Sequence, residues 1–173
     1  MRSPDAIQLI DHPAIPGAEK TTWMDLGCGN GLFTKALASL LYPGSHITAV
    51  DMNAGSLKKL SGSYNGVIIE TRQQDITTMT FPSALDGILM ANALHYVAHQ
   101  NNFIQALQTA VKKDGHVIIV EYDTDRSNQW VPYPVSFNKL KLLFTENGFN
   151  HIERIAVYPS VYGATIYAAI ISF

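Results

Sequence analysis

Two kinds of hydrophobic segment alternate along this chain. Short, unbroken runs rich in Val and Ile are typical of strands covered on both faces, whereas longer stretches with apolar residues three and four positions apart are typical of helices. The pattern predicts helices over residues 32–41, 56–64, 103–111 and 137–147. It predicts strands over residues 23–26, 47–50, 67–69, 85–90, 117–120, 152–158 and 165–173.

This alternation defines the fold class. Strands separated by helices favour an α/β fold, with an open, mostly parallel sheet and helices on both faces. The last two strands are joined by a short loop that contains Pro159 and Gly163, so we expect them to pair antiparallel. In such sheets, ligands bind beyond the carboxyl ends of the strands, and the chemistry is therefore expected there.

Composition narrows the class of protein. The chain has 173 residues, a formal net charge of −2 and one cysteine. This length fits one domain, which we assign to residues 21–173 after a short N-terminal lid or cap segment over residues 1–20. One cysteine excludes an internal disulfide framework and favours a cytoplasmic location. No apolar run approaches the ~20 residues that cross a bilayer, so no membrane partner is expected.

A glycine-rich turn follows the first predicted strand and leads into the first predicted helix. Glycine permits a tight turn and a close approach of the backbone to a ligand. An ordinary turn of this kind needs one glycine, but this one has three at alternate positions, Gly27, Gly29 and Gly31. The dinucleotide pattern G-x-G-x-x-G would place its third glycine where Leu32 stands, and Asp25 precedes the first glycine by two residues.

Residues 25–31 resemble, at every fixed position, the first motif of the class I S-adenosylmethionine (SAM)-dependent methyltransferases, D/E-x-G-x-G-x-G. The resemblance extends over roughly residues 21–173. It implies a seven-stranded sheet of order 3-2-1-4-5-7-6 whose last strand is antiparallel. It also implies SAM as the cofactor, with S-adenosylhomocysteine (SAH) as its product, bound at the turn by Asp25, Gly27, Cys28, Gly29 and Gly31.

Two further acidic residues follow predicted strands. Asp51 ends the second strand and Met52 comes next; in the family, such a carboxylate accepts hydrogen bonds from the ribose hydroxyls and the apolar residue covers the adenine. Helix capping by Asp51 or Asn53 is the alternative. Asp75 and Ile76 follow the third strand, where the resemblance implies contacts with the adenine amino group and ring. A solvated loop aspartate is the alternative there.

The segment after the fourth strand, residues 91–97, resembles an N/S-x-L-H-x-V stretch of small-molecule methyltransferases that runs past the amino-acid end of SAM. Asn92 is then the candidate contact for that end, and Tyr96 a candidate contact for the substrate. His95 is the candidate catalytic residue, as a general base or a substrate contact, because imidazole titrates near neutral pH. A structural hydrogen bond at a helix start is the equal alternative for His95.

A long polar and aromatic loop follows the fifth strand. Connections between a strand and a helix usually have about two to six residues, and longer ones are often functional. Tyr122, Trp130 and Tyr133 are predicted to form an acceptor pocket, with Tyr162 of the terminal hairpin on the same side. The alternative is that Trp130 and the nearby prolines pack this loop onto the edge of the sheet.

These features predict a methyltransferase that moves a methyl group from SAM to a small-molecule acceptor, at O or N rather than C. No N-P-P-Y segment follows the fourth strand, which disfavours methylation of DNA bases or of glutamine. Asp123 and Asp125 match no recognisable metal site, so no metal is expected. An NAD(P)-linked oxidoreductase and a non-catalytic SAM-fold subunit of a complex remain as alternatives.

Partners follow from charge and from the room left outside the core. Acidic residues dominate the predicted carboxyl ends of the strands, which suits a sulfonium cation and disfavours nucleic acid. Nearly all of the chain is used by the predicted core, which leaves residues 1–20 and the loop around Trp130 to cover the acceptor. We therefore expect an open active site, or one that a second copy covers in a homodimer.

Overall fold

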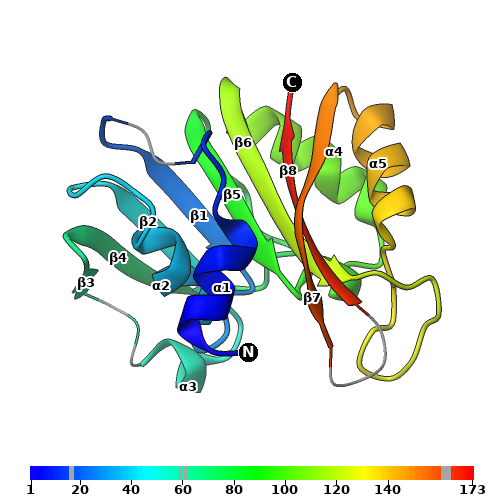
Figure 1. Cartoon of the computed structure of the whole chain (residues 1–173), viewed down its shortest axis with the longest axis horizontal. Helices are drawn as coiled ribbons and strands as arrows, with labels where there is room; N and C mark the ends of the chain where they lie inside the picture. The colour runs from blue at the N-terminus through cyan, green and yellow to red at the C-terminus, as the bar shows by residue number, and fades with distance from the viewer. Residues whose placement is uncertain (16–17, 59, 61, 161–164) are drawn as a thin grey trace.

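The computed structural model describes residues 1–15, 18–58, 60, 62–160 and 165–173 and contains one eight-stranded sheet (Figure 1). The α/β fold class is confirmed. The helices are α1 Ser3–Ile10, α2 Leu32–Ala38, α3 Ala54–Leu57, the 3-10 helix η1 Leu94–Tyr96, α4 Gln100–Ala110 and α5 Phe137–Glu146. The strands are β1 Thr22–Leu26, β2 His46–Asp51, β3 Gly62–Tyr64, β4 Val67–Gln73, β5 Leu85–Ala91, β6 Val111–Tyr122, β7 His151–Pro159 and β8 Thr165–Ser172.

The order of strands in the sheet is β3-β4-β2-β1-β5-β6-β8-β7. The five strands from β4 to β6 are parallel, β8 is antiparallel to β6, and β7 is antiparallel to β8. Without β3, this is the order 3-2-1-4-5-7-6 that the sequence predicts, and the terminal pair is the predicted antiparallel hairpin. The edge strand β3 is an addition to the predicted seven.

The predicted helix over residues 56–64 is wrong. α3 ends at Leu57, and β3 pairs antiparallel with β4 through a two-residue turn. The turn residues Asn65 and Gly66 both have positive φ, 51° and 81°. An Asn-Gly pair is the strongest short-range signal for such a hairpin turn, because both residues tolerate this conformation. The apolar spacing before it imitates a helical face, but the turn decides the local structure.

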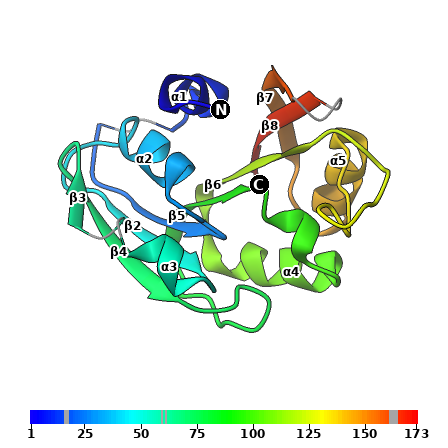
Figure 2. The same ribbon diagram turned by 90° about the horizontal axis from the view of Figure 1, so that it is seen from below.

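Helices cover both faces of the sheet, α1 and α2 on one side and α4 on the other, as Figure 2 shows. The central strand β6 contributes to both layers. Val117 and Ile119 belong to the cluster under α4 and α5, whereas Ile118 and Val120 belong to the cluster under α1 and α2. Because successive side chains of a strand point to opposite faces, burial on both sides explains the unbroken hydrophobic run in this segment.

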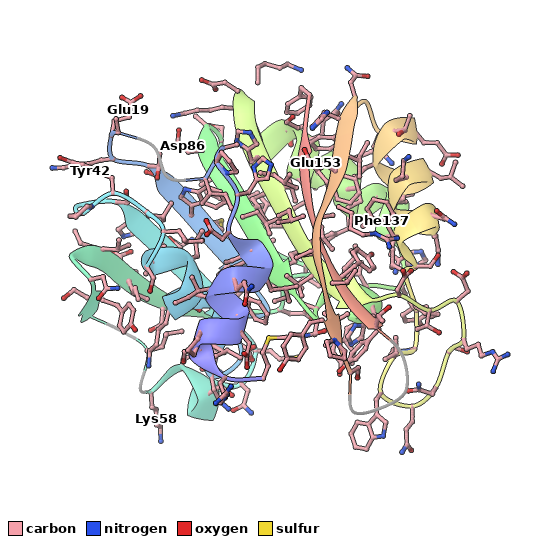
Figure 3. The ribbon with its side chains drawn as sticks, viewed as in Figure 1. Glu19, Tyr42, Lys58, Asp86, Phe137 and Glu153 are labelled. Atoms are coloured by element: carbon pink, nitrogen blue, oxygen red, sulfur yellow. The ribbon has the colours of Figure 1, made fainter. Side chains whose placement is uncertain are left out.

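The carboxyl ends of the parallel strands lie along the lower edge in Figure 1, where α3 and the loop after β6 also lie. The amino ends lie at the opposite edge, where the Lys112 ammonium pairs with the Asp86 carboxylate at 2.5 Å. Figure 3 shows Asp86 at that edge and Lys58, which follows α3, at the carboxyl edge. The sheet therefore separates a structural edge from the edge that carries the predicted site.

The N-terminal segment packs along the side of the sheet that carries α2. α1 lies against α2 and buries Ala6, Leu9 and Ile10. Its role as a lid stays a prediction. Within the described part of the chain, no helix is both long and apolar enough to span a membrane.

Two leucines of α5 provide a test of this packing. Leu140 is fully buried, whereas 65% of Leu142 is exposed. We expect Leu140→Ala to lower the free energy of unfolding by about 2–5 kcal/mol, since it removes core contacts and leaves a cavity. Leu142→Ala, the matched control in the same helix, should change it by less than about 0.5 kcal/mol. Chemical denaturation measures both, and equal losses would contradict the packing described for α5.

Candidate active site

The glycine-rich turn connects β1 to α2 and is fixed to the neighbouring strand. The backbone N–H groups of Gly27 and Cys28 both donate to the Val50 carbonyl of β2, at 2.8 and 3.0 Å. All three glycines have positive φ, between 52° and 78°. This left-handed conformation disfavours residues with a Cβ atom, so the turn depends on glycine at each position.

The three glycines have different surroundings. A Cβ atom on Gly27 would approach the Cβ of Ala93 to 2.6 Å, and one on Gly31 would collide with the Leu60 side chain. A Cβ atom on Gly29 would meet no atom within 4 Å. Two glycines thus allow close packing within the protein, whereas Gly29 borders open space that a ligand can approach.

Asp51 lies next to that open space at the end of β2. Its Oδ2 accepts a hydrogen bond from the Gly29 N–H at 2.8 Å, and its Oδ1 accepts one from the Asn53 N–H at 2.8 Å. The cap of α3 is Asn53, whose side chain accepts from the Gly55 N–H. Asp51 therefore does not cap the helix, and its carboxylate is aligned with the glycine turn.

Asp25 is buried beneath the turn. Its Oδ2 accepts a hydrogen bond from the Thr34 hydroxyl at 2.5 Å, and its Oδ1 has no partner among the described residues. Burial raises the pKa of Asp25 to about 7, and the nearby negative charge of Asp51 adds to this shift, although the Thr34 bond opposes it. Burial thus favours the protonated form of this carboxyl group more than water does.

The three predicted adenine contacts, Met52, Asp75 and Ile76, flank the same region. Met52 is largely exposed, and Ile76 is partly buried against the cluster under α4. Asp75 Oδ1 accepts hydrogen bonds from the Thr77 N–H and hydroxyl, and these bonds lower the pKa of Asp75. The Gln74 N–H donates to the Asp51 carbonyl at 3.1 Å, which brings the Asp75 loop beside Asp51.

Asn92 follows β5 and shows two signs of a functional position. Its φ is +52°, which is uncommon for a residue with a Cβ atom. Its buried Oδ1 has no hydrogen-bond partner among the described residues. Because a buried acceptor is expensive to leave unpaired, such an atom points to a donor supplied by a ligand. The Asn92 N–H donates to the Val120 carbonyl, which fixes the backbone here.

His95 and Glu121 form a buried pair, exposed by only 2% and 1%. Glu121 Oε2 lies 2.7 Å from His95 Nδ1, and its Oε1 accepts from the His95 backbone N–H at 3.1 Å. Because the carboxylate accepts a hydrogen bond, His95 Nδ1 carries a proton, and Nε2 is the ring nitrogen that does not contact Glu121. The pairing thereby fixes both the position and the tautomer of the imidazole. The sequence placed Glu121 at an acidic strand end but did not predict this pairing, since the two residues are 26 positions apart.

A cavity of about 620 Å³ lies over the ends of β5 and β6. Three of the predicted substrate residues, Tyr96, Tyr122 and Trp130, line it together with His95 and Asn92. Sequence reasoning missed the other lining residues, Thr124, Arg126, Asn128 and Val131. These residues belong to a loop with no periodic pattern of apolar residues, so its unusual length was the only sequence signal that the loop is functional.

Tyr133 is not among the residues that line this cavity. Its backbone instead anchors the loop: the Tyr133 N–H donates to the His95 carbonyl at 3.0 Å, and its carbonyl accepts from Gln100 Nε2 at 2.9 Å. Trp130 remains 70% exposed, so it does not pack the loop onto the sheet. Tyr162 lies outside the described residues.

Two other chemical features limit what the site can do. The Cys28 thiol is buried, and this burial raises its pKa far above the ordinary value, so the thiol stays protonated. In the described ranges, no three His, Cys, Asp or Glu side chains are grouped closely enough to hold a metal ion.

Solved structures with a similar fold include SAM-dependent methyltransferases. The DhpI–SAH complex superposes with a TM-score of 0.72 at 23% identity, over 97% of this chain and 82% of that one. Human N-acetylserotonin methyltransferase in complex with SAM gives a TM-score of 0.68 at 17% identity, over 98% of this chain and 51% of that one. The fold is therefore that of this enzyme class.

Sequence comparison gives the family. The profile of the methyltransferase domain family matches residues 24–119, more than half of the chain, and the chain belongs to that family. An uncharacterised methyltransferase of Mycobacterium tuberculosis is 28% identical over 110 residues, 62% of this chain and 54% of that protein. A ubiquinone biosynthesis O-methyltransferase of Marinobacter nauticus is 28% identical over 102 residues, 56% of this chain and 42% of that protein. The chain thus spans about half the length of these relatives, and the predicted family is confirmed.

The raised pKa of Asp25 predicts a pH dependence of stability. Between the unfolded pKa of 3.8 and the folded value of about 7, the folded chain binds a proton that the unfolded chain has released. Stability should therefore fall as the pH rises through this window, by roughly 2–3 kcal/mol from pH 5 to 8. Thermal unfolding without ligand measures it, with Asp25→Asn as the isosteric reference. Parallel pH profiles of the two proteins would contradict the assignment.

Proposed function

We propose that this chain is a SAM-dependent methyltransferase that acts on a small-molecule acceptor, at oxygen or nitrogen. The proposal rests on the open space at Gly29, which the Asp51 carboxylate borders, together with Asn92 Oδ1, which has no partner among the described residues. Membership of the methyltransferase domain family supports it and counts against an NAD(P)-linked oxidoreductase. The names of the O-methyltransferase relatives support oxygen as the acceptor atom.

The residues present fit SAM. Asp51 has lone pairs that remain after its two backbone hydrogen bonds, and these suit the two hydroxyl donors of a ribose. Asn92 Oδ1 and Asp25 Oδ1 lack partners among the described residues and suit the cationic groups of the amino-acid end and the sulfonium. Met52 and Ile76 offer apolar surface, and Asp75 a carboxylate, for the adenine. The backbone of residues 27–31 would line the path between these ends.

When bound, SAM supplies a methyl group on a positively charged sulfur, so the protein mainly binds, orients and excludes water. His95 lines the acceptor cavity and takes the proton that an acceptor hydroxyl or amine loses on methylation. Glu121 accepts a hydrogen bond from His95 Nδ1–H, which leaves Nε2 as the basic atom and stabilises the imidazolium that forms. Glu121 is thus a positioning residue for His95.

The surroundings of the cavity indicate the kind of acceptor. Aromatic rings and a few polar groups line it, as is typical of sites for small organic molecules. The exposed rings of Tyr96 and Trp130 at its rim support the expectation that a second copy covers the site in a homodimer. The non-catalytic alternative is disfavoured because the glycine turn and the buried His95–Glu121 pair are both intact.

Cofactor binding is the first test. We expect calorimetry to detect SAH binding to the wild-type chain and at least about tenfold weaker binding to Asp51→Ala, a loss of about 1.4 kcal/mol. Gly29→Ala should weaken binding similarly, since its Cβ would occupy the open space. Asp114→Ala, which removes an exposed carboxylate at the opposite edge, is the control and should bind SAH normally. If the wild-type chain binds neither SAM nor SAH, the proposed function is wrong.

Methyl transfer is the second test. A screen of hydroxylated and aminated metabolites with labelled SAM identifies an acceptor, and with it we expect Glu121→Gln to lower kcat by about 10²–10⁴-fold, the range typical of general base catalysis. SAH affinity should be unchanged, and the rise of kcat/KM with pH should shift. His95→Gln should give a loss of similar size. Full activity in both variants would show that the pair is structural.

A further inference from the structure

A second cavity of about 500 Å³ adjoins the acceptor cavity. Asn92 and Tyr122 line both cavities, so the two spaces meet where β5 and β6 end. Asn92 directly follows β5, and Tyr122 is the last residue of β6, so both boundary residues are positioned by strands of the sheet. The two cavities are therefore neighbours that share these two side chains as a common boundary.

The second cavity differs from the first in its chemistry. Beyond the shared pair and Ser160, its lining is apolar or aromatic and consists of Met1, Leu32, Phe33, Tyr158, Pro159 and Ile166. The hydroxyl of Tyr158 donates to Asp5 Oδ2 at 3.3 Å, which leaves the ring as its contribution to the wall. His95 and Arg126 line the first cavity, whereas none of the described residues that line the second has a charged side chain.

Strand register explains why these residues lie together. Ile166 of β8 is the direct neighbour of Tyr122 in β6 and of Tyr158 in β7. These three side chains pack with Leu32 and Phe33 at the start of α2, in the cluster under α1 and α2. The second cavity therefore opens on the α2 side of the sheet. The helix that carries His95 belongs to the other side, where Leu94 joins the cluster under α4.

The cofactor does not account for this apolar space. The amino-acid end of SAM carries charged groups, and burying them against apolar side chains without partners is unfavourable. Asn92 Oδ1, at the boundary between the two cavities, and Asp25 Oδ1 have no partners among the described residues and suit that end better than the apolar side chains beyond the boundary. Binding of a hydrocarbon group here is favourable, in contrast, and the binding free energy grows in magnitude with the apolar area that the group buries.

We propose that the second cavity binds an apolar tail of the methyl acceptor. The acceptor is then amphipathic: its nucleophilic head lies beside His95, and its hydrocarbon chain passes Tyr122 into the space between α2 and the ends of β7 and β8, while Asn92 Oδ1 stays with the amino-acid end of SAM. This substrate class rests on the proposed function, since the head group is placed by the methyl-transfer site.

The experiment uses 4-n-alkylphenols, from phenol to 4-octylphenol, as probes of the full chain in the presence of SAH. We expect the dissociation constant to decrease about fourfold for each added methylene until the cavity is filled. The reason is that burying one methylene contributes about 0.8 kcal/mol to the binding free energy. In the Ile166→Trp variant the larger side chain fills the cavity, so the dissociation constant should depend much less on the length of the alkyl chain. Long-chain phenols should then lose far more affinity than phenol does.

Val157→Trp is the matched control. Val157 precedes Tyr158 in β7 but is exposed and pairs with Tyr167, which belongs to the opposite cluster. The Val157→Trp variant should keep the wild-type dependence of the dissociation constant on chain length. This result would exclude nonspecific adsorption as the cause of that dependence. If Ile166→Trp does not fold, Ile166→Ala replaces it: the enlarged cavity should move the plateau to longer chains.

Three results would overturn the tail site: no dependence on chain length in the wild type, the same dependence in the Ile166 variant, or no binding of any phenol while SAH binds. A chain that binds no SAH fails the proposed function instead. The phenol series without SAH then still reports on the cavity alone, so the two failures are distinguishable.

Discussion

The Val50 carbonyl of β2 is the atom on which the site depends, because it accepts both the Gly27 and the Cys28 N–H. These two bonds continue the β1–β2 pairing past the last residue of β1 and force the chain to turn there. The turn then starts α2, and it brings the Gly29 N–H to the Asp51 carboxylate. One carbonyl thus links the sheet, the first helix and the space beside Gly29. A bulkier residue at any of the three glycines would disturb that link, either by strain or by collision.

Much of this arrangement follows from local sequence signals. The buried strands, the helices α2, α4 and α5 and the glycine turn were predictable, because each is set by residues within a short window, whereas the helix α1 was not predicted. The hairpin at Asn65 and Gly66 was predictable in principle, but the apolar spacing before it suggested a helix, and turn chemistry prevailed. β3 is short and exposed, so no hydrophobic pattern identifies it.

The site was predictable only as far as its residues directly follow strands. Asp51 and Asn92 lie where strand ends lie in any parallel sheet, so their proximity to the glycine turn follows from topology. The pairing of Glu121 with His95 joins two strand ends whose adjacency depends on the order of β5 and β6. Tyr133 shows the limit: an aromatic residue in a long loop suggests a pocket wall, yet its backbone bonds to His95 and Gln100 decide its position.

Glu121 and Asp25 are both buried at the carboxyl edge of the sheet, but they differ in the hydrogen-bond partners that offset the unfavourable burial. Glu121 has a histidine and two backbone N–H groups as partners, so its charge is compensated within the protein. Asp25 has one hydroxyl donor and an unpaired oxygen, and its pKa rises to about 7. A group left in that state gains most from a cation that arrives with a ligand, because the cation supplies the missing compensation. The described residues therefore supply donors to both oxygens of Glu121 but leave one oxygen of Asp25 without a donor, so Asp25 is the carboxyl group whose charge a bound cation would change most.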